Sequence, residues 1–191
     1  AATYDTIQAA VDDATNGTRV LVSPGIYRES LTLDGNITLS APRGARIDGQ
    51  AVQTNTSGIE IASGQPTISN FTITNFTTGI SAAAETESWR VENVTIGETH
   101  RVGVNATGST GEWVISNTTI EGPGLAGTRG VLATNTTGNW TLTESSISGH
   151  EVELVAGSVG PTPIAVNNYW GSEAGPNVPV SDTDSDVRSE E

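Results

Sequence analysis

The residues of this sequence best suited to acid–base chemistry are Arg43, Arg46 and Asp48, which follow one another closely. A carboxylate and guanidinium groups gathered at one place could supply the acid or base that cleaves a polysaccharide. An aspartate before Gly49 is also typical of a turn, and arginines beside it are often no more than surface charge. We expect the structural role, and the catalytic role is the alternative.

Two histidines occupy comparable places in a sequence repeat that is described below. His100 and His150 each lie three or four residues after the isoleucine that ends a repeated phrase. Histidine is the natural general base near neutral pH, and Glu98 and Glu151 stand close by as further acid–base candidates. Two repeats separate the histidines, a gap of roughly 10 Å, which is too far for a shared proton or metal. We expect turn histidines without a catalytic role.

Metal binding has one weak motif, near the C-terminus. Asp182, Asp184 and Asp186 alternate like the first ligands of a calcium loop, but Val187 stands where the sixth position needs glycine. The sequence has no cysteine, which excludes zinc and iron–sulfur sites built on thiolates. We expect no cofactor, with calcium at these three aspartates as the alternative to a solvated acidic tail.

Three tryptophans share one position of the repeat and should form a column of indoles. Trp89, Trp113 and Trp140 would offer a surface for stacking on sugar rings if that column faced outward. They alternate in step with apolar residues such as Ile115, which must be buried. This parity favours a stacked column at the edge of the core.

The elements that position these residues are set by two interleaved phrases. The first sequence phrase recurs at spacings of 23, 24 and 27 residues, and the second recurs at similar spacings between copies of the first. Apolar residues alternate within each phrase, as in strands with one buried face. Units of this length describe coils of a β-solenoid of about seven rungs, whereas a propeller blade needs roughly 40 residues. The first phrase occupies 66–73, 89–96, 113–120 and 140–147, and the second begins at Gly58, Gly79, Gly103, Gly130 and Glu151.

The two ends of the chain differ from its middle. Asp5 and Gln8 have capping-box spacing, and the apolar residues after them fall on one helical face. We predict an amphipathic cap helix over about 4–15 and a solenoid domain over 1–177. Residues 178–191 have too little apolar content to fold alone and are predicted to be an acidic tail or linker.

The opening and closing segments resemble a known family. Residues 4–14, 20–29 and 47–49 look like the start of right-handed parallel β-helix proteins of the pectin-lyase-like superfamily. Residues 167–176 are similar to a phrase that ends β-helix repeat domains of the copper-accessory and carbohydrate-binding type. The resemblance implies a right-handed single-stranded parallel β-helix. It implies no single activity, because that superfamily includes lyases, hydrolases, adhesins, phage tailspikes and non-catalytic modules.

The catalytic patterns of those enzymes are missing from the sequence. Pectate lyases hold calcium with clustered acidic side chains and place an arginine or lysine as the base, and polygalacturonases use paired aspartates with His-Gly and Arg-Ile-Lys phrases. The only adjacent aspartates are Asp12 and Asp13, in the predicted cap helix, and the chain has no lysine. A copper-delivery role is also disfavoured, because methionine and cysteine are absent.

Asparagine is used in an unusual way. Ten of the 13 asparagines begin Asn-X-Ser/Thr, the acceptor motif for N-glycosylation. Three of these share a rung position, and for Asn70, Asn93 and Asn117 we expect an inward ladder of amides, which would make them poor acceptors. Six of the other seven are the predicted acceptors, in expected loops or on an outward strand position: Asn16, Asn55, Asn75, Asn105, Asn135 and Asn139.

Charge narrows the function classes further. Eight basic residues against 22 acidic ones give a formal net charge of −14, which excludes nucleic-acid binding. No stretch approaches the roughly 18 consecutive apolar residues of a membrane-spanning helix. A lysine-free acidic surface is similar to that of proteins from extreme halophiles, where salt screens charges within about 3 Å.

These observations predict a non-catalytic, N-glycosylated module of a cell-surface or virion protein from a salt-loving archaeon or its virus. It would serve a structural or adhesive role in high salt, with glycans or other surface proteins as partners. The alternative is a small polysaccharide lyase or glycoside hydrolase. The sequence leaves the ligand and the oligomeric state open.

Overall fold

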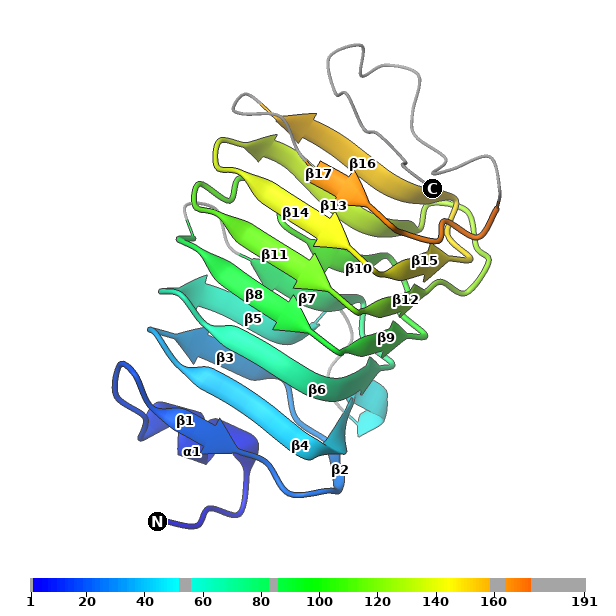
Figure 1. Ribbon diagram of the computed structural model, residues 1–191. Coiled ribbons are helices and arrows are strands. Elements are labelled where there is room, and N and C mark those ends of the chain that lie inside the picture. The colour runs from blue at the N-terminus through cyan, green and yellow to red at the C-terminus, as the bar shows by residue number, and fades with distance from the viewer. Residues whose placement is uncertain (1, 52–55, 83–85, 159–163, 173–191) are drawn as a thin grey trace.

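The computed structural model describes residues 2–51, 56–82, 86–158 and 164–172. It is all-β, with 53% strand and 5% helix, and winds into a parallel β-solenoid of about five turns. In Figure 1 the strands of the near sheet run from left to right, those of the far sheet return, and each lap lies above the one before. This is right-handed winding, and the expected parallel β-helix is confirmed.

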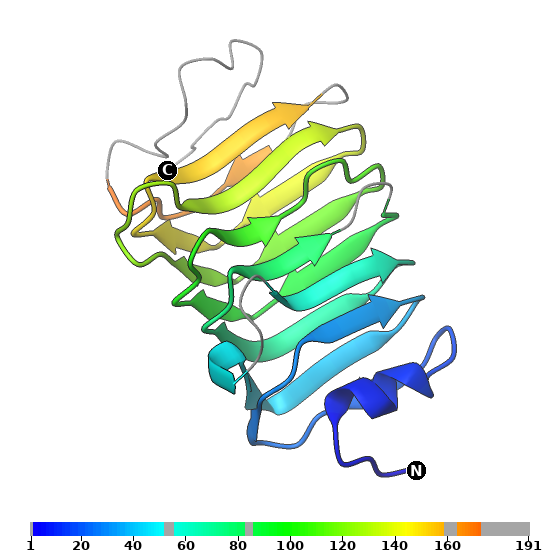
Figure 2. The same ribbon diagram turned by 180° about the vertical axis from the view of Figure 1, so that it is seen from behind.

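Two parallel sheets form the walls of the solenoid. The first contains β1 (Arg19–Leu21), β2 (Ile26–Tyr27), β4 (Thr38–Asp48), β6 (Thr67–Thr74), β8 (Trp89–Glu92), β9 (Thr95–Gly97), β11 (Trp113–Ser116), β12 (Thr119–Glu121), β14 (Trp140–Thr143), β15 (Ser146–Ser148) and β17 (Ile164–Val166). The second, on the near side in Figure 2, contains β3 (Leu31–Asp34), β5 (Ser57–Ser63), β7 (Thr78–Ala82), β10 (Val102–Asn105), β13 (Arg129–Thr136) and β16 (Val152–Ser158).

The number of rungs depends on how the ends are counted. Within the described residues the first sheet stacks β1, β4, β6, β8, β11, β14 and β17 along the axis. The terminal strands β1 and β17 are only three residues long. The expected seven rungs therefore correspond to about five turns together with partial coils at both ends.

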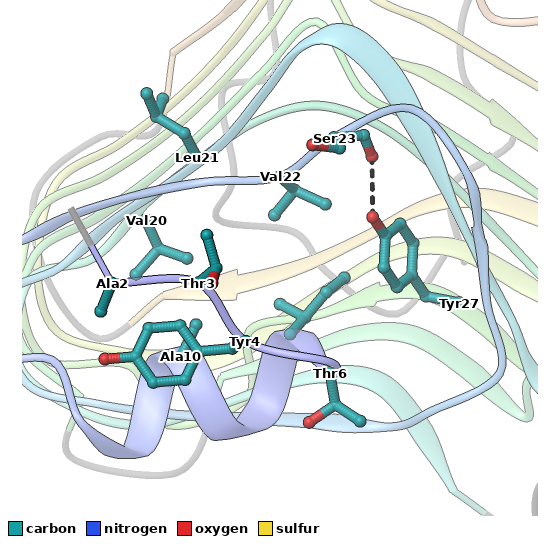
Figure 3. Close-up of a pocket in the computed structure, with 11 residues that line it drawn as sticks. Ala2, Thr3, Tyr4, Thr6, Ala10, Val20, Leu21, Val22, Ser23 and Tyr27 are labelled. Atoms are coloured by element: carbon teal, nitrogen blue, oxygen red, sulfur yellow. Dashed lines mark hydrogen bonds between the residues drawn. The ribbon is translucent and has the colours of Figure 1, made fainter.

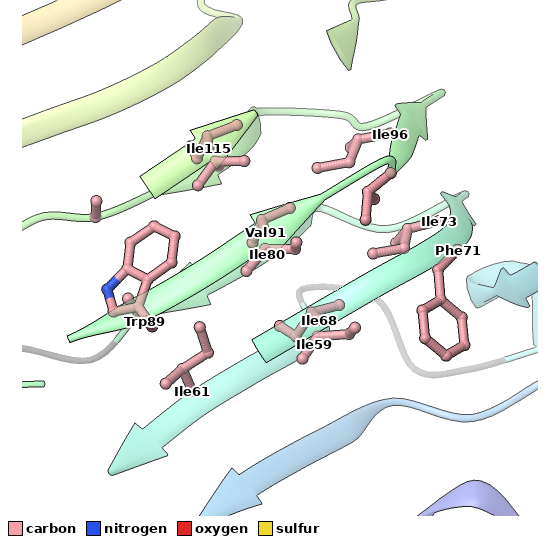
Figure 4. Packing of buried hydrophobic residues seen from close by; sticks show 14 of the residues in the cluster. Ile59, Ile61, Ile68, Phe71, Ile73, Ile80, Trp89, Val91, Ile96 and Ile115 are labelled. Atoms are coloured by element: carbon pink, nitrogen blue, oxygen red, sulfur yellow. The ribbon is translucent and has the colours of Figure 1, made fainter. Parts of the chain in front are cut away.

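The repeated isoleucines line up as successive neighbours along the axis. Ile73 pairs with Ile96, Ile96 with Ile120, and Ile120 with Ile147. All four are fully buried. Figure 4 shows Ile73 and Ile96 of this ladder together with Ile59 and Ile80 of the opposite sheet, in the space between the walls. The period-2 alternation therefore identified the inward positions, and stacking makes each inward residue pack on its counterparts one coil away.

The glycines of the second phrase have a packing reason. A Cβ built on Gly103 would lie 2.3 Å from Cγ2 of Ile120 and 2.6 Å from the carbonyl oxygen of Gly130. Gly79 meets Ile96 in the same way at 2.4 Å, because the two sheets approach closely at this corner. The two repeated phrases recur at the same spacing because the glycine of one packs against the isoleucine of the other.

The rung asparagines do not form an inward ladder, and that prediction is wrong. Asn70, Asn93 and Asn117 adopt left-handed backbone conformations, with φ of 65°, 53° and 48°. Asn93 and Asn117 are exposed, and Asn70 is half-buried. Asn93 and Asn117 lie at the corner where the first sheet bends between two short strands, and Asn70 lies within the longer strand β6. Asparagine recurs there because it tolerates positive φ better than other residues with a side chain, and not because its amide bonds the next coil.

The cap helix is shorter than expected. Helix α1 (Ile7–Asp12) begins after Thr6, whose hydroxyl accepts a hydrogen bond from the Ala9 N–H, so Thr6 and not Asp5 is the N-cap. The carboxylate of Glu29, from the first coil, accepts the N–H groups of Ile7 and Gln8 at 3.0 Å each. Figure 2 shows the helix at the N-terminal end of the column. No helix in the described part of the chain is long and apolar enough to cross a membrane.

Candidate functional site

Asp48 is a buried carboxylate that several neighbouring groups hold in place. It ends β4, is 5% exposed, and accepts hydrogen bonds from Asn75 Nδ2 at 2.8 Å and from the Gln50 N–H at 3.0 Å. The Arg46 guanidinium lies 3.6 Å from its other oxygen. The hydrogen bond from Asn75 lowers the pKa of Asp48 below its ordinary value of 3.8, helped by Gln50 and the charges of Arg46 and Arg28 and opposed by burial. The carboxylate is therefore ionised and already hydrogen-bonded.

Arg43 is not part of this cluster. It lies in an exposed bulge of β4, where the register with β6 shifts between Ser40 and Ala45. The structure therefore brings Arg46 and Asp48 together and leaves Arg43 outside. An ionised aspartate held by an amide and a guanidinium can brace the corner between two coils. Among the described residues, the groups that shift its pKa are an amide, a backbone N–H and two guanidinium groups, and not the second carboxylate that an acid–base pair needs.

The histidines and their glutamates lie on different coils. His100 follows β9 and His150 follows β15, and β12 lies between these strands in the sheet. At about 4.8 Å per coil their backbones are about 10 Å apart along the axis. Glu98 is exposed with a positive φ, and Glu151 accepts the Gly127 N–H at 2.5 Å. These four side chains do not converge on one point.

His150 is buried beside a close contact between two coils. It is 9% exposed, and a Cβ on Gly122 would lie 2.7 Å from its ring. Burial lowers the pKa of His150 to about 4, and a weak contact with the Ser148 backbone opposes the shift. Its ring nitrogens have no well-aligned hydrogen-bond partner among the described residues. His150 is therefore neutral near pH 7 and closed off from substrate.

The tryptophans form the predicted column, and it lies inside the protein. Trp89 and Trp113 stack at 4.9 Å between ring centroids with 2° between planes, and Trp113 and Trp140 at 4.9 Å with 4°. The three residues are 3%, 0% and 1% exposed. Stacking on sugar rings is therefore excluded at this column, because its rings cover one another and are otherwise enclosed by the core.

A small hollow opens at the N-terminal end of the solenoid (Figure 3). It has a volume of about 170 Å³ and lies between α1, the segment before it and β1. Tyr4, Leu21 and Tyr27 line it, and the Tyr27 hydroxyl donates to the Ser23 carbonyl at 2.9 Å. None of its lining side chains is charged, so this hollow offers hydrocarbon and hydroxyl contacts and no acid or base.

A metal ion held by side chains needs several ligands at one point. No three histidine, aspartate or glutamate side chains in the described part of the chain lie close enough to hold an ion. Asp182, Asp184 and Asp186 fall outside the described residues, as do the boundary at 177 and the tail over 178–191.

The predicted glycan acceptors differ in how their amides are used. Asn16, Asn135 and Asn139 are exposed, Asn105 is half-buried, and Asn55 lies outside the described residues. Asn16 Oδ1 accepts the Asn36 N–H at 2.8 Å, which leaves its Nδ2 outside that bond. Asn139 Nδ2 donates to Glu112 at 3.3 Å on the surface.

Asn75 is the acceptor that the structure disfavours. It is half-buried, and its Nδ2, the atom that would carry the glycan, is the donor to Asp48. Sequence reasoning missed this contact because the two residues are 27 positions apart. The signal in the sequence was that Asp48 comes one residue after Ile47 and Asn75 two residues after Ile73, and these isoleucines pair in the sheet.

Comparison of the chain with protein-family models, with curated proteins and with solved structures finds no match.

Proposed function

We propose that this chain is a non-catalytic module of a cell-surface or virion protein, carries N-linked glycans, and works as a rigid column in high salt. The observation that carries the proposal is the dispersal of its acid–base residues. The ionised Asp48 is already bound by Asn75 and Arg46, and the histidines with their neighbouring glutamates are spread over separate coils. Catalysis by paired groups needs them at one point.

The surface of the column supports an exterior location. Acceptor motifs at Asn16, Asn135 and Asn139 have exposed side chains, and a glycan at these positions would extend into solvent. The chain has no cysteine, so its rigidity comes from stacked coils and not from disulfides. A structural or adhesive role, with glycans or other surface proteins as partners, suits such a column.

The acidity supports adaptation to salt. A formal net charge of −14 with no lysine produces self-repulsion that weakens the folded chain at low ionic strength. Molar salt shortens the screening length to about 3 Å and removes most of this repulsion. A halophilic archaeon or its virus is the source we propose, and the pectin-lyase-like superfamily is the proposed family.

Two measurements test the proposal together. Thermal unfolding followed by circular dichroism should show a rising midpoint between low salt and molar KCl, and incubation with polyuronate in high salt should release no unsaturated product by ultraviolet absorbance. An unchanged midpoint would contradict the salt adaptation.

Product release would favour the alternative, a polysaccharide lyase. The Asp48→Asn variant then decides whether the braced carboxylate is responsible, because it keeps the size of the side chain and removes its charge. Arg43→Gln is the matched control, since Arg43 lies outside the Asp48 cluster.

A further inference from the structure

We propose that Asn93 and Asn117, which the sequence disfavours as acceptors, carry N-linked glycans on the folded protein and make one corner of the solenoid a glycan-bearing edge. The inference rests on the proposed exterior location and deepens it by assigning the positions. It starts from the left-handed corner between the two halves of the first sheet, where both residues are exposed.

The corner turns both side chains outward. Asn93 follows β8, whose inward Val91 is buried, and Asn117 follows β11, whose inward Ile115 is buried. Each backbone N–H is used by the next coil, since Asn93 donates to the Ser116 carbonyl at 3.2 Å and Asn117 to that of Thr143 at 3.2 Å. The backbone at the corner is therefore held firmly, while the side chains project from it.

Each acceptor motif is completed by a hydroxyl two residues later. Thr95 begins β9 and is exposed, and Thr119 begins β12 and is half-buried. These two threonines are paired neighbours in the sheet. The left-handed backbone explains the asparagines, but it does not require the threonines: Asn167 has the same conformation and is followed two positions later by Tyr169.

The amides of Asn93 and Asn117 make no hydrogen bond within the described residues, whereas the amide of Asn75 is held by Asp48. In the transfer step, Nδ2 bonds to the anomeric carbon of a lipid-linked oligosaccharide. The bond from that carbon to the lipid phosphate oxygen breaks, the lipid phosphate leaves, and the amide proton passes to a base of the transferase. An Nδ2 that already donates to a buried carboxylate must first give up that bond.

The experiment compares the folded chain with its own peptides. Folded protein and a proteolytic digest are each incubated with a single-subunit archaeal oligosaccharyltransferase and its lipid-linked oligosaccharide, and occupancy is mapped by glycopeptide mass spectrometry. In the folded chain, occupancy at Asn93 and Asn117 should exceed that at Asn75 by about tenfold or more, because Asn75 must lose a hydrogen bond to a charged acceptor. In the digest this difference should disappear.

Two variants test whether glycan transfer to Asn93 and Asn117 depends on the acceptor motif itself. Thr95→Val and Thr119→Val keep a β-branched strand residue and remove the hydroxyl of the motif, so each should abolish occupancy two residues earlier without altering the circular dichroism spectrum. If Asn135 and Asn139 carry glycans while Asn93 and Asn117 of the folded chain carry none, this assignment is overturned and the proposed function still stands. Absence of modification at every motif in both samples would overturn both.

Discussion

Replacing Gly103 by alanine tests whether the two sheets meet as closely as the structure places them. Gly103 lies in β10 with a backbone conformation that alanine can adopt, so the added methyl group is the whole perturbation. That methyl would lie 2.3 Å from Cγ2 of Ile120 and 2.6 Å from the Gly130 carbonyl oxygen. The isoleucine is fully buried and the carbonyl belongs to the next coil, so neither moves freely.

Overpacking of a filled core costs about 1–3 kcal/mol, and contact with rigid backbone places Gly103→Ala at the upper end, about 3 kcal/mol. The control is Gly97→Ala, also in a strand of the solenoid, where a Cβ meets nothing within 4 Å. We expect that substitution to stay within about 0.5 kcal/mol of the parent or to stabilise it slightly. The contrast between the two glycines removes any general effect of replacing glycine.

Urea unfolding followed by circular dichroism and by tryptophan fluorescence measures both free energies, and coincident transitions establish that the solenoid unfolds in one step. The double variant Gly103→Ala/Ile120→Ala should cost less than the sum of its parts by about 0.5 kcal/mol or more, because the smaller side chain admits the methyl. Equal stability of the Gly103→Ala and Gly97→Ala proteins would refute the packing explanation for the repeated glycines.

Two further predictions concern the interior. Trp113→Ala should lower the free energy of unfolding, measured in urea, by about 3–5 kcal/mol. This loss should exceed that of Trp140→Ala by about 0.5–1.5 kcal/mol, because Trp113 has two stacked neighbours among the described rings and Trp140 has one. A larger loss for Trp140→Ala would contradict the tryptophan column. Stability should fall as pH drops from 6.5 to about 4, because the unfolded chain protonates His150 before the folded chain does. His150→Gln should flatten this part of the pH profile.

The repeat was readable from the sequence because it is local. Alternation within each phrase marks the inward positions, and Ile96 and Ile120 are in register because they hold the same position within their phrases. The burial of Trp113 followed from the same parity. In each case the alternation of apolar residues within one short strand is enough to identify the inward positions. Parallel stacking places the same positions next to one another in successive coils.

The corners were misjudged because alternation stops there. A single left-handed residue reverses the direction of the side chain, so Asn93 and Asn117 project outward although the strand pattern continued inward. The N-cap was misplaced for a related reason: Glu29, more than twenty residues away, holds the first N–H groups of the helix. Neither the sign of φ nor a partner from another coil is contained in a short window of sequence.

The sequence by itself determined that this chain is a stacked, cysteine-free and strongly acidic column, because period, parity and charge are properties of residue order and composition. Only the tertiary structure decided which amides are free and which are engaged. Asn75 and Asn93 have the same acceptor motif, yet one donates to Asp48 from the neighbouring coil and the other faces solvent. Stacking sets that difference, because it places Asp48 on the coil next to Asn75.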